Sequence, residues 1–207
     1  MDSPSRTLVI GIAGGIASGK SAVSALVAGE HGRVVVADRI AREVLHSPEV
    51  TAQVAAHFGP ECIGADGRPD REALAARVFA DPGTRETLEG WIHPLVRANI
   101  SAELADAAAT GVPVVVLDVP LLFENDAQHG LVALCDAILF VEAPLPERNA
   151  RAVANRGWQA GEVARREAAQ LPLSEKRDRS THVVRNSGTP DDLKSEVARV
   201  LAELGAD

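Results

Sequence analysis

The segment GGIASGKSA, residues 14–22, has the residue types and the spacing of a phosphate-binding loop. The pattern G-x-x-x-x-G-K-[ST] is matched by Gly14, Gly19, Lys20 and Ser21, and the apolar segment TLVIGIA before it is typical of a short strand. Glycines let successive backbone N–H groups point at phosphate oxygens, beside the N-terminus of the next helix. Lysine reaches the β- and γ-phosphates of a nucleoside triphosphate, and serine can coordinate Mg²⁺. The segment therefore predicts a nucleoside-triphosphate site.

Two aspartates stand at the ends of apolar segments that predict strands. Asp38 follows RVVVA (residues 33–37), and Asp118 ends VPVVVLD (residues 112–118). A carboxylate that faces the γ-phosphate could accept the proton of an attacking hydroxyl, and one at the end of a central strand could hold Mg²⁺ directly or through water. Each aspartate could equally cap the helix or turn that follows it. The spacing alone leaves both interpretations open.

The segment from Glu147 to Arg179 reverses the sign of the charge. It carries eight Lys or Arg and five acids, a local charge of +3 in a chain of net charge −8. This composition favours a lid, because arginines donate hydrogen bonds to phosphate oxygens and a closing segment excludes water. The alternative for any single arginine is a solvated helix face.

The hydrophobic pattern predicts the elements that must position these residues. Short apolar, β-branched segments predict five strands, at 7–13, 33–37, 112–118, 137–143 and 181–186. Helical patterns separate them, including a helix over 20–29 after the glycine loop and an amphipathic helix near the end of the chain. The alternation predicts an α/β fold, an open and mostly parallel sheet with helices on both faces. Ligands of such sheets bind at the carboxyl ends of the strands, where the loop, both aspartates and Asn186 fall.

Residues 39–110 follow a helical pattern without a strong strand signal. Their length exceeds a simple crossover helix, so we interpret them as a helical insertion beside the sheet. Pro94, within WIHPLV, lacks a backbone donor and predicts a kink or a break between two helices near His93.

The loop VPLLFEN (residues 119–125) follows Asp118 directly. We expect it to keep apolar residues exposed beside Glu124. Leu121, Leu122 and Phe123 are most simply core residues, and the functional alternative is a wall of an acceptor pocket.

The composition excludes several classes of protein. A chain of 207 residues, 46% hydrophobic and 24% charged, fits one globular domain with a small inserted subdomain. No apolar run approaches the roughly 18–20 residues that span a membrane, and MDSPSRT has no signal-peptide core, so we expect a cytoplasmic protein. The net charge argues against a protein that coats nucleic acid. Cys62 and Cys135 lack zinc-site spacing, which favours buried free thiols.

Among nucleotide-binding proteins, the sequence favours a small-molecule kinase. No N-K-x-D element, which reads guanine, stands near the last strands, and the chain is short for a transporter or helicase ATPase. Two alternatives stay open: a kinase that acts on another nucleoside, nucleotide or sugar, and a nucleotide-dependent switch that transfers no phosphate to a small molecule.

Five motifs, in order and spacing, resemble those of the bacterial dephospho-CoA kinase family: GIAGGIASGKS, VADRIAREVL, WIHPLVR, VVLDVPLLFEN and the NSG of residues 186–188. The resemblance covers about residues 7–204. It implies the P-loop NTPase fold in a single domain, residues 1–207. The implied parts are a core (7–38, 112–143 and 181–207) with a five-stranded parallel sheet, a helical CoA-binding insertion (about 39–111) and a lid (about 144–180).

The resemblance implies transfer of the γ-phosphate of ATP to the 3′-hydroxyl of the ribose in dephospho-coenzyme A, the last step of coenzyme A synthesis. Asp38 takes the place of the catalytic aspartate, with Lys20 at the transferred phosphate. The implied ATP-binding residues are Gly15, Ala17, Ser18, Gly19, Lys20, Ser21, Ala22, Arg148, Asn186 and Gly188. The implied substrate-binding residues are His93, Pro94, Leu121, Leu122, Phe123, Glu124 and Arg151.

Mg²⁺, held by Ser21 and Asp118, is the implied cofactor. The expected partners are the small-molecule substrates ATP and dephospho-CoA, and we expect neither nucleic acid nor a membrane as a partner. The expected oligomeric state is a monomer or weak homo-oligomer.

The sequence departs from the family pattern at a few positions. Val36 stands where an acid is usual, and Ala22 replaces a threonine, which leaves Ser21 as the only hydroxyl ligand for Mg²⁺. Thr181 and Arg185 stand where acids are common.

Overall fold

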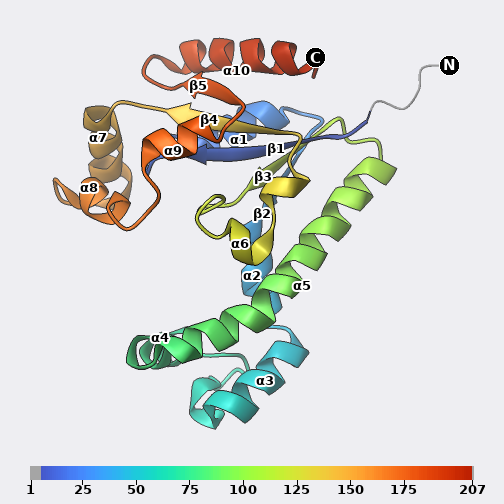
Figure 1. Cartoon of the computed structure of the whole chain (residues 1–207), viewed down its shortest axis with the longest axis vertical. Coiled ribbons are helices and arrows are strands. Elements are labelled where there is room, and N and C mark those ends of the chain that lie inside the picture. Colours follow the sequence, from blue (N-terminus) through green and yellow to red (C-terminus); the bar gives the residue numbers. More distant parts are fainter. Residues whose placement is uncertain (1–5, 207) are drawn as a thin grey trace. The chain divides into compact units, whose positions relative to one another are not determined.

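A computed structural model describes residues 6–206 of the chain (Figure 1). The chain divides into two compact units, Met1–Val36 with Glu103–Asp207, and Ala37–Ala102. The first unit contains the sheet and the second is helical.

The first unit is built on a five-stranded parallel sheet in the order β2-β3-β1-β4-β5 (Figure 1). The strands are β1 (Leu8–Gly14), β2 (Arg33–Val36), β3 (Val114–Asp118), β4 (Ala137–Glu142) and β5 (His182–Arg185). The predicted α/β fold with a parallel five-stranded sheet is therefore confirmed. Strands β2 to β5 end at or one residue before the predicted last residue, and β1 continues one residue beyond it, to Gly14.

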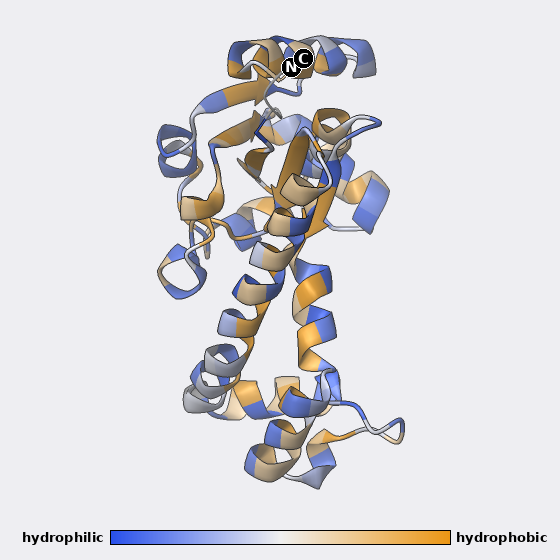
Figure 2. Cartoon of the chain, turned by 90° about the vertical axis from the view of Figure 1, so that its right-hand side faces the viewer, coloured by the Kyte–Doolittle hydropathy of each residue, from blue (hydrophilic) through white to orange (hydrophobic). Residues whose placement is uncertain are grey.

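Helices cover both faces of this sheet. The helices of the first unit are α1 (Lys20–Ala28), α6 (Asp126–His129), α7 (Leu145–Arg156), α8 (Glu162–Glu167), α9 (Leu173–Asp178) and α10 (Pro190–Leu204), with a 3₁₀ turn η2 (Val132–Leu134). On one face, α1 and α10 bury a continuous cluster that includes Ile10, Ile12, Val23, Leu139 and Val197. Figure 2 shows the strands as mainly hydrophobic ribbon, as expected for a sheet covered on both faces.

The opposite face of the sheet is packed closely around Gly11. A Cβ atom added to Gly11 would lie 2.9 Å from Cys135 Sγ, 3.1 Å from Leu122 Cδ2 and 3.3 Å from Ile138 Cγ1. Cys62 is buried and Cys135 is partly buried, and both are free thiols. Burial raises the pKa of the Cys135 thiol to about 12.

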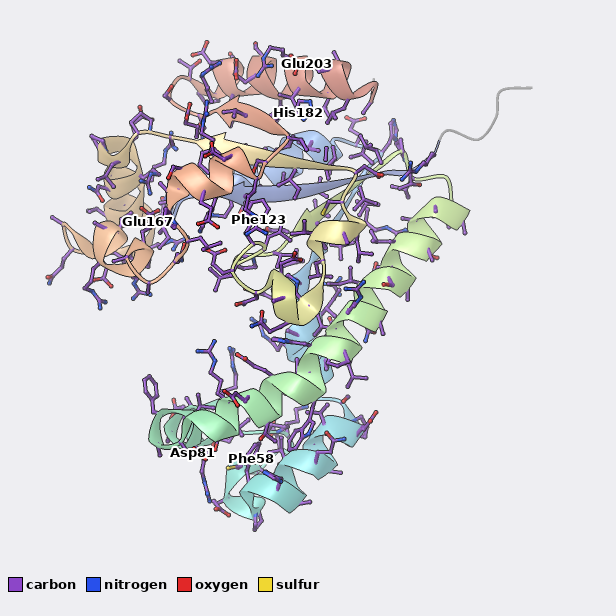
Figure 3. The ribbon with its side chains drawn as sticks, viewed as in Figure 1. Phe58, Asp81, Phe123, Glu167, His182 and Glu203 are labelled. Atoms are coloured by element: carbon purple, nitrogen blue, oxygen red, sulfur yellow. The ribbon has the colours of Figure 1, made fainter. Side chains whose placement is uncertain are left out.

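The second unit consists of α2 (Ala37–Leu45), α3 (Pro48–Phe58), a 3₁₀ turn η1 (Pro60–Cys62), α4 (Arg71–Ala80) and most of α5 (Pro82–Ala109), whose last turns belong to the first unit. Side chains fix two helix starts: the Ser47 hydroxyl accepts from the Val50 N–H, and the Asp70 carboxylate accepts from Glu72 and Ala73 N–H groups. Phe58 is buried in this unit (Figure 3), and its ring centroid lies 5.4 Å from that of the partly buried Trp91.

Helix α5 runs through Pro94 without interruption, so of the two predicted outcomes near His93, a kink or a break, the break does not occur. Proline removes only its own N–H from the helix ladder, and the other hydrogen bonds of this 28-residue helix suffice to continue it. Within the described residues, no helix is both long and apolar enough to cross a membrane.

We expect the close packing at Gly11 to make Gly11→Ala destabilising by about 1–3 kcal/mol, because the added methyl group must displace buried side chains. The matched control is Gly90→Ala in α5, where an added Cβ meets nothing within 4 Å and where alanine favours the helix by about 0.5–1 kcal/mol. Urea unfolding of both variants measures the difference. A Gly11→Ala protein as stable as the parent would contradict this description of the core.

Candidate functional site

The glycine loop connects the central strand β1 to helix α1. Gly14 ends β1 with φ 145°, and a Cβ atom there would lie 2.7 Å from the Val141 carbonyl oxygen. Gly19 has φ 98°, and a Cβ atom there would lie 2.1 Å from Asn186 Nδ2. Both positions therefore require glycine for conformation and for space. The following residues begin α1, so the loop N–H groups gather at a helix N-terminus, where anions bind.

The ammonium group of Lys20 folds back onto the loop. Its Nζ donates to the carbonyl oxygens of Gly14 (3.1 Å) and Gly15 (2.9 Å). The pKa of Lys20 is lowered to about 8, mainly by burial and next by the charge of Lys176, while the Asp118 carboxylate acts in the opposite direction. A partly desolvated cation beside a ring of N–H groups is suited to bind a polyphosphate.

The ends of the neighbouring strands bring polar side chains to the same edge. Asp118 ends β3, which pairs directly with β1. Asn186 follows β5 and is only 8% exposed, and its Nδ2 donates to the Ser18 carbonyl oxygen at 2.7 Å. Arg151 donates to that same oxygen (3.2 Å) and to the Asn186 carbonyl oxygen (2.9 Å). The loop is thus held by a strand end and by the helix α7.

A cavity of about 250 Å³ lies over the loop in the first unit. Its lining residues are Ala17, Ser18, Gly19, Lys20, Ser21, Ala22, Arg151, Asn155 and Arg156. Every predicted ATP-binding residue from Ala17 to Ala22 is in this lining, whereas Gly15, Arg148, Asn186 and Gly188 are not.

Gly15 lies against a buried ion pair between Arg148 and Glu167. Arg148 Nη1 is 2.5 Å from Glu167 Oε1, and the two side chains are 5% and 14% exposed. Figure 3 shows Glu167 at the end of α8. A Cβ atom on Gly15 would come within 2.8 Å of both charged groups. The absence of a side chain at this position therefore allows the ion pair to approach the loop backbone.

The loop after β3 is less exposed than predicted. Leu122 and Phe123 are 2% and 4% exposed, so their interpretation as core residues is confirmed and the expectation of exposed apolar residues is wrong for these two. Leu122 packs against the sheet beside Gly11, and the Arg179 guanidinium lies 4.5 Å from the centroid of the Phe123 ring. Glu124 Oε1 lies 2.5 Å from Lys176 Nζ in a second buried ion pair.

Three of the predicted residues, Asp38, His93 and Pro94, belong to the second unit. Asp38 is the second residue of α2 and is exposed, so it does not occupy the cap position before that helix. It lines a cavity of about 270 Å³ together with Ala41, Arg42, Leu45, Arg71 and Ile92. His93 and Pro94 lie in α5.

Two unusual residues of the sequence have structural partners. The Thr181 hydroxyl accepts from the Ile138 N–H and donates to the Ile138 carbonyl oxygen, each at 3.0 Å, at the start of the β4–β5 pairing. The Arg185 guanidinium lies 3.9 Å from Glu142. Thr181 thus lies at the beginning of the β4–β5 pairing and Arg185 at its end.

Glu167 and Lys176 are the site neighbours that the residue pattern did not single out. The charge excess of residues 147–179 favoured a lid. A sum of charges does not show which charged side chains form ion pairs, so it could not identify Glu167 or Lys176. Within the described residues most of these cations are paired, including Arg148, Arg151, Arg165, Arg166 and Lys176.

A phosphate loop between the central strand and the first helix of a parallel sheet, with a basic segment beside it, defines the P-loop kinase fold. A solved structure of shikimate kinase from Acinetobacter baumannii shares it, with a TM-score of 0.53, 12% identity and coverage of 98% of this chain and 97% of that one. The particular family is narrower: the family model for dephospho-CoA kinase matches residues 8–192, and the chain belongs to this family. The predicted family membership is thereby confirmed.

Individual relatives support the assignment. The dephospho-CoA kinase of Anaeromyxobacter dehalogenans is 44% identical over 95% of this chain and 92% of its own length. That of Deinococcus radiodurans is 40% identical over 98% of this chain and 95% of its own. A Thermus thermophilus crystal structure, 40% identical, superposes with a TM-score of 0.78 and covers 96% of this chain and 98% of that chain. The family is one of kinases that catalyse the final step of coenzyme A biosynthesis.

The lowered pKa of Lys20 predicts a pH dependence of stability in the absence of nucleotide. The folded chain releases the proton near pH 8 and the unfolded chain near pH 10.5. Between these values the unfolded state binds more protons, so the stability contribution of Lys20 rises with pH. We expect the difference in free energy of unfolding between the parent and Lys20→Met to move in favour of the parent from pH 8 to 10.5, measured by urea unfolding. A difference that is constant over this window would contradict the burial of the ammonium group.

Proposed function

We propose that this chain transfers the γ-phosphoryl group of ATP to the 3′-hydroxyl of the ribose in dephospho-coenzyme A, which yields coenzyme A and ADP. The observation that carries the proposal is the phosphate loop in a chain of the dephospho-CoA kinase family, with Lys20 on the loop carbonyls beside Asp118. Phosphoryl transfer requires that a nucleotide be held, that an acceptor be activated and that water be excluded. The chain has residues suited to each task.

The loop and its neighbours hold the nucleotide. The N–H groups from Ala17 to Ser21 bind the phosphates, and Lys20 leaves the loop carbonyls to meet the β- and γ-oxygens, which are stronger acceptors. Asn186 and Gly188 contribute to the adenine end. The contacts of Arg151 with Ser18 favour the nucleotide side for this arginine, rather than the acceptor side that the family resemblance implied.

Mg²⁺ is the cofactor of this proposal, and the residues present fit it. Ser21 is exposed at the start of α1, and Asp118 is half-buried at the end of β3, near Lys20. Within the described residues no group of three or more His, Cys, Asp or Glu forms a metal site. A metal held by phosphates, water and one or two protein oxygens matches the usual binding of Mg²⁺. When bound, the ion neutralises charge on the phosphates.

Asp38 is the proposed base. Its exposed carboxylate accepts the proton of the 3′-hydroxyl as the ribose oxygen forms a bond to the γ-phosphorus and the bond to ADP breaks. The cavity beside it contains two guanidinium groups, Arg42 and Arg71, which suit the phosphates of the acceptor. His93, Pro94 and the loop from Leu121 to Glu124 are proposed to complete the acceptor side.

Replacing the carboxylate tests the role of Asp38. We expect Asp38→Asn to lower kcat by at least about a hundredfold with little change in ATP affinity, because the amide cannot accept the proton. The matched control is Glu43→Gln, which removes an exposed carboxylate from the same helix, one paired only with Arg39. Steady-state kinetics of both variants provide the comparison. Turnover of Asp38→Asn within threefold of the parent would remove Asp38 from the mechanism.

The activity itself is tested by release of ADP from Mg-ATP with different acceptors. We expect strong stimulation by dephospho-CoA and none by AMP, CMP, adenosine or gluconate, with a product heavier by one phosphate. Stimulation by another acceptor would support kinase activity but contradict dephospho-CoA as the substrate. Slow hydrolysis that no acceptor stimulates would favour a nucleotide-dependent switch.

A further inference from the structure

Ala17 has a backbone conformation that alanine rarely adopts. Its φ is 57°, and among residues 6–206 it is the one non-glycine residue with positive φ. The Cβ atom makes this left-handed region unfavourable by about fivefold to thirtyfold for a residue other than glycine. Such a conformation persists only where the surrounding contacts impose it. The contacts that matter here are those of the preceding residue, Ile16.

The peptide groups next to Ala17 are held by the ion pair at the back of the loop. Glu167 Oε1 accepts a hydrogen bond from the Ile16 N–H at 2.7 Å. Arg148 Nη1 donates to the Ile16 carbonyl oxygen at 3.2 Å, which belongs to the peptide group that joins Ile16 to Ala17. The pair thus binds both backbone polar groups of the residue that precedes Ala17.

The pair is itself firmly anchored. Arg148 Nε donates to the Ala143 carbonyl oxygen at 3.1 Å, directly after β4, and its Nη1 is 2.5 Å from Glu167 Oε1. Both side chains are largely buried, so water competes little for these hydrogen bonds. The anchor lies on the sheet, and the pair can therefore impose a conformation on the loop instead of following it.

We propose that Arg148 and Glu167 form a backbone clamp that holds Ala17 in its left-handed conformation and so keeps the phosphate loop ready for the triphosphate. The two side chains are positioning residues: they act through Ile16 on the loop N–H groups. The inference rests on the proposed function only in taking the loop as the nucleotide site. It also assigns Arg148 a role other than direct contact with ATP.

A second-site substitution separates the clamp from a general effect on structure. Without the clamp, alanine at position 17 relaxes out of the left-handed region, whereas glycine can stay there at little cost. We expect Glu167→Ala to weaken ATP binding by about fivefold to thirtyfold. Adding Ala17→Gly should restore the affinity to within about threefold of the parent, and Ala17→Gly alone should change it little. The measurement is the dissociation constant of Mg-ATP by calorimetry without acceptor.

The control is Glu175→Ala, which removes an exposed lid carboxylate whose ion-pair partner is Arg179, one turn along the chain. It should leave ATP affinity unchanged. If Glu167→Ala does not fold, Glu167→Gln serves instead, because the amide oxygen still accepts from Ile16 while the ion pair is lost. We then expect a smaller loss of affinity, again reversed by Ala17→Gly. Thermal unfolding monitors the fold of each variant.

The clamp is overturned if the glycine substitution does not restore binding, or if the loss of Glu167 leaves the affinity unchanged. Turnover with dephospho-CoA is measured separately on the same proteins. A parent that binds ATP but phosphorylates no dephospho-CoA would refute the proposed function and leave the binding rescue intact. Failure of the rescue in an active kinase would refute the clamp alone.

Discussion

The site depends on one constraint: a short backbone segment must present its N–H groups to an anion before the anion arrives. The loop backbone needs contacts with other residues to keep this conformation, because Gly14, Ala17 and Gly19 all have positive φ. The loop is therefore gripped by its surroundings. Asn186 and Arg151 bind the Ser18 carbonyl oxygen, and Arg148 and Glu167 bind the Ile16 peptide groups. The fold supplies these partners because parallel strands end at one edge.

Charge is balanced around the same loop. A cation with a lowered pKa, Lys20, lies among loop carbonyls, while Glu167 and Glu124 are each paired with a buried cation of the lid segment. Pairing matters because an uncompensated carboxylate beside the loop would repel a triphosphate. The segment from Glu147 to Arg179 thus carries an acid, Glu167, close to the phosphate site while its net charge remains positive.

Local patterns predicted most of the fold and the loop. The strands were recognisable because each is a short β-branched segment, and the loop because glycine spacing reflects backbone conformation directly. Contacts between distant residues were not predictable: Glu167 binds Ile16 across 151 positions. The continuity of α5 through Pro94 depends on interactions along the whole helix, which a short window of sequence does not contain. The roles of Asp38 and the acceptor residues remain predictions.

The central claim is the position at which the acceptor gains its phosphate. The most direct measurement is ³¹P and ¹H NMR of the product formed by the purified protein from Mg-ATP and dephospho-CoA. The account predicts a new phosphomonoester coupled to the 3′ proton of the ribose, in a product identical to coenzyme A. Phosphate at another position, or only inorganic phosphate from hydrolysed ATP, would contradict it.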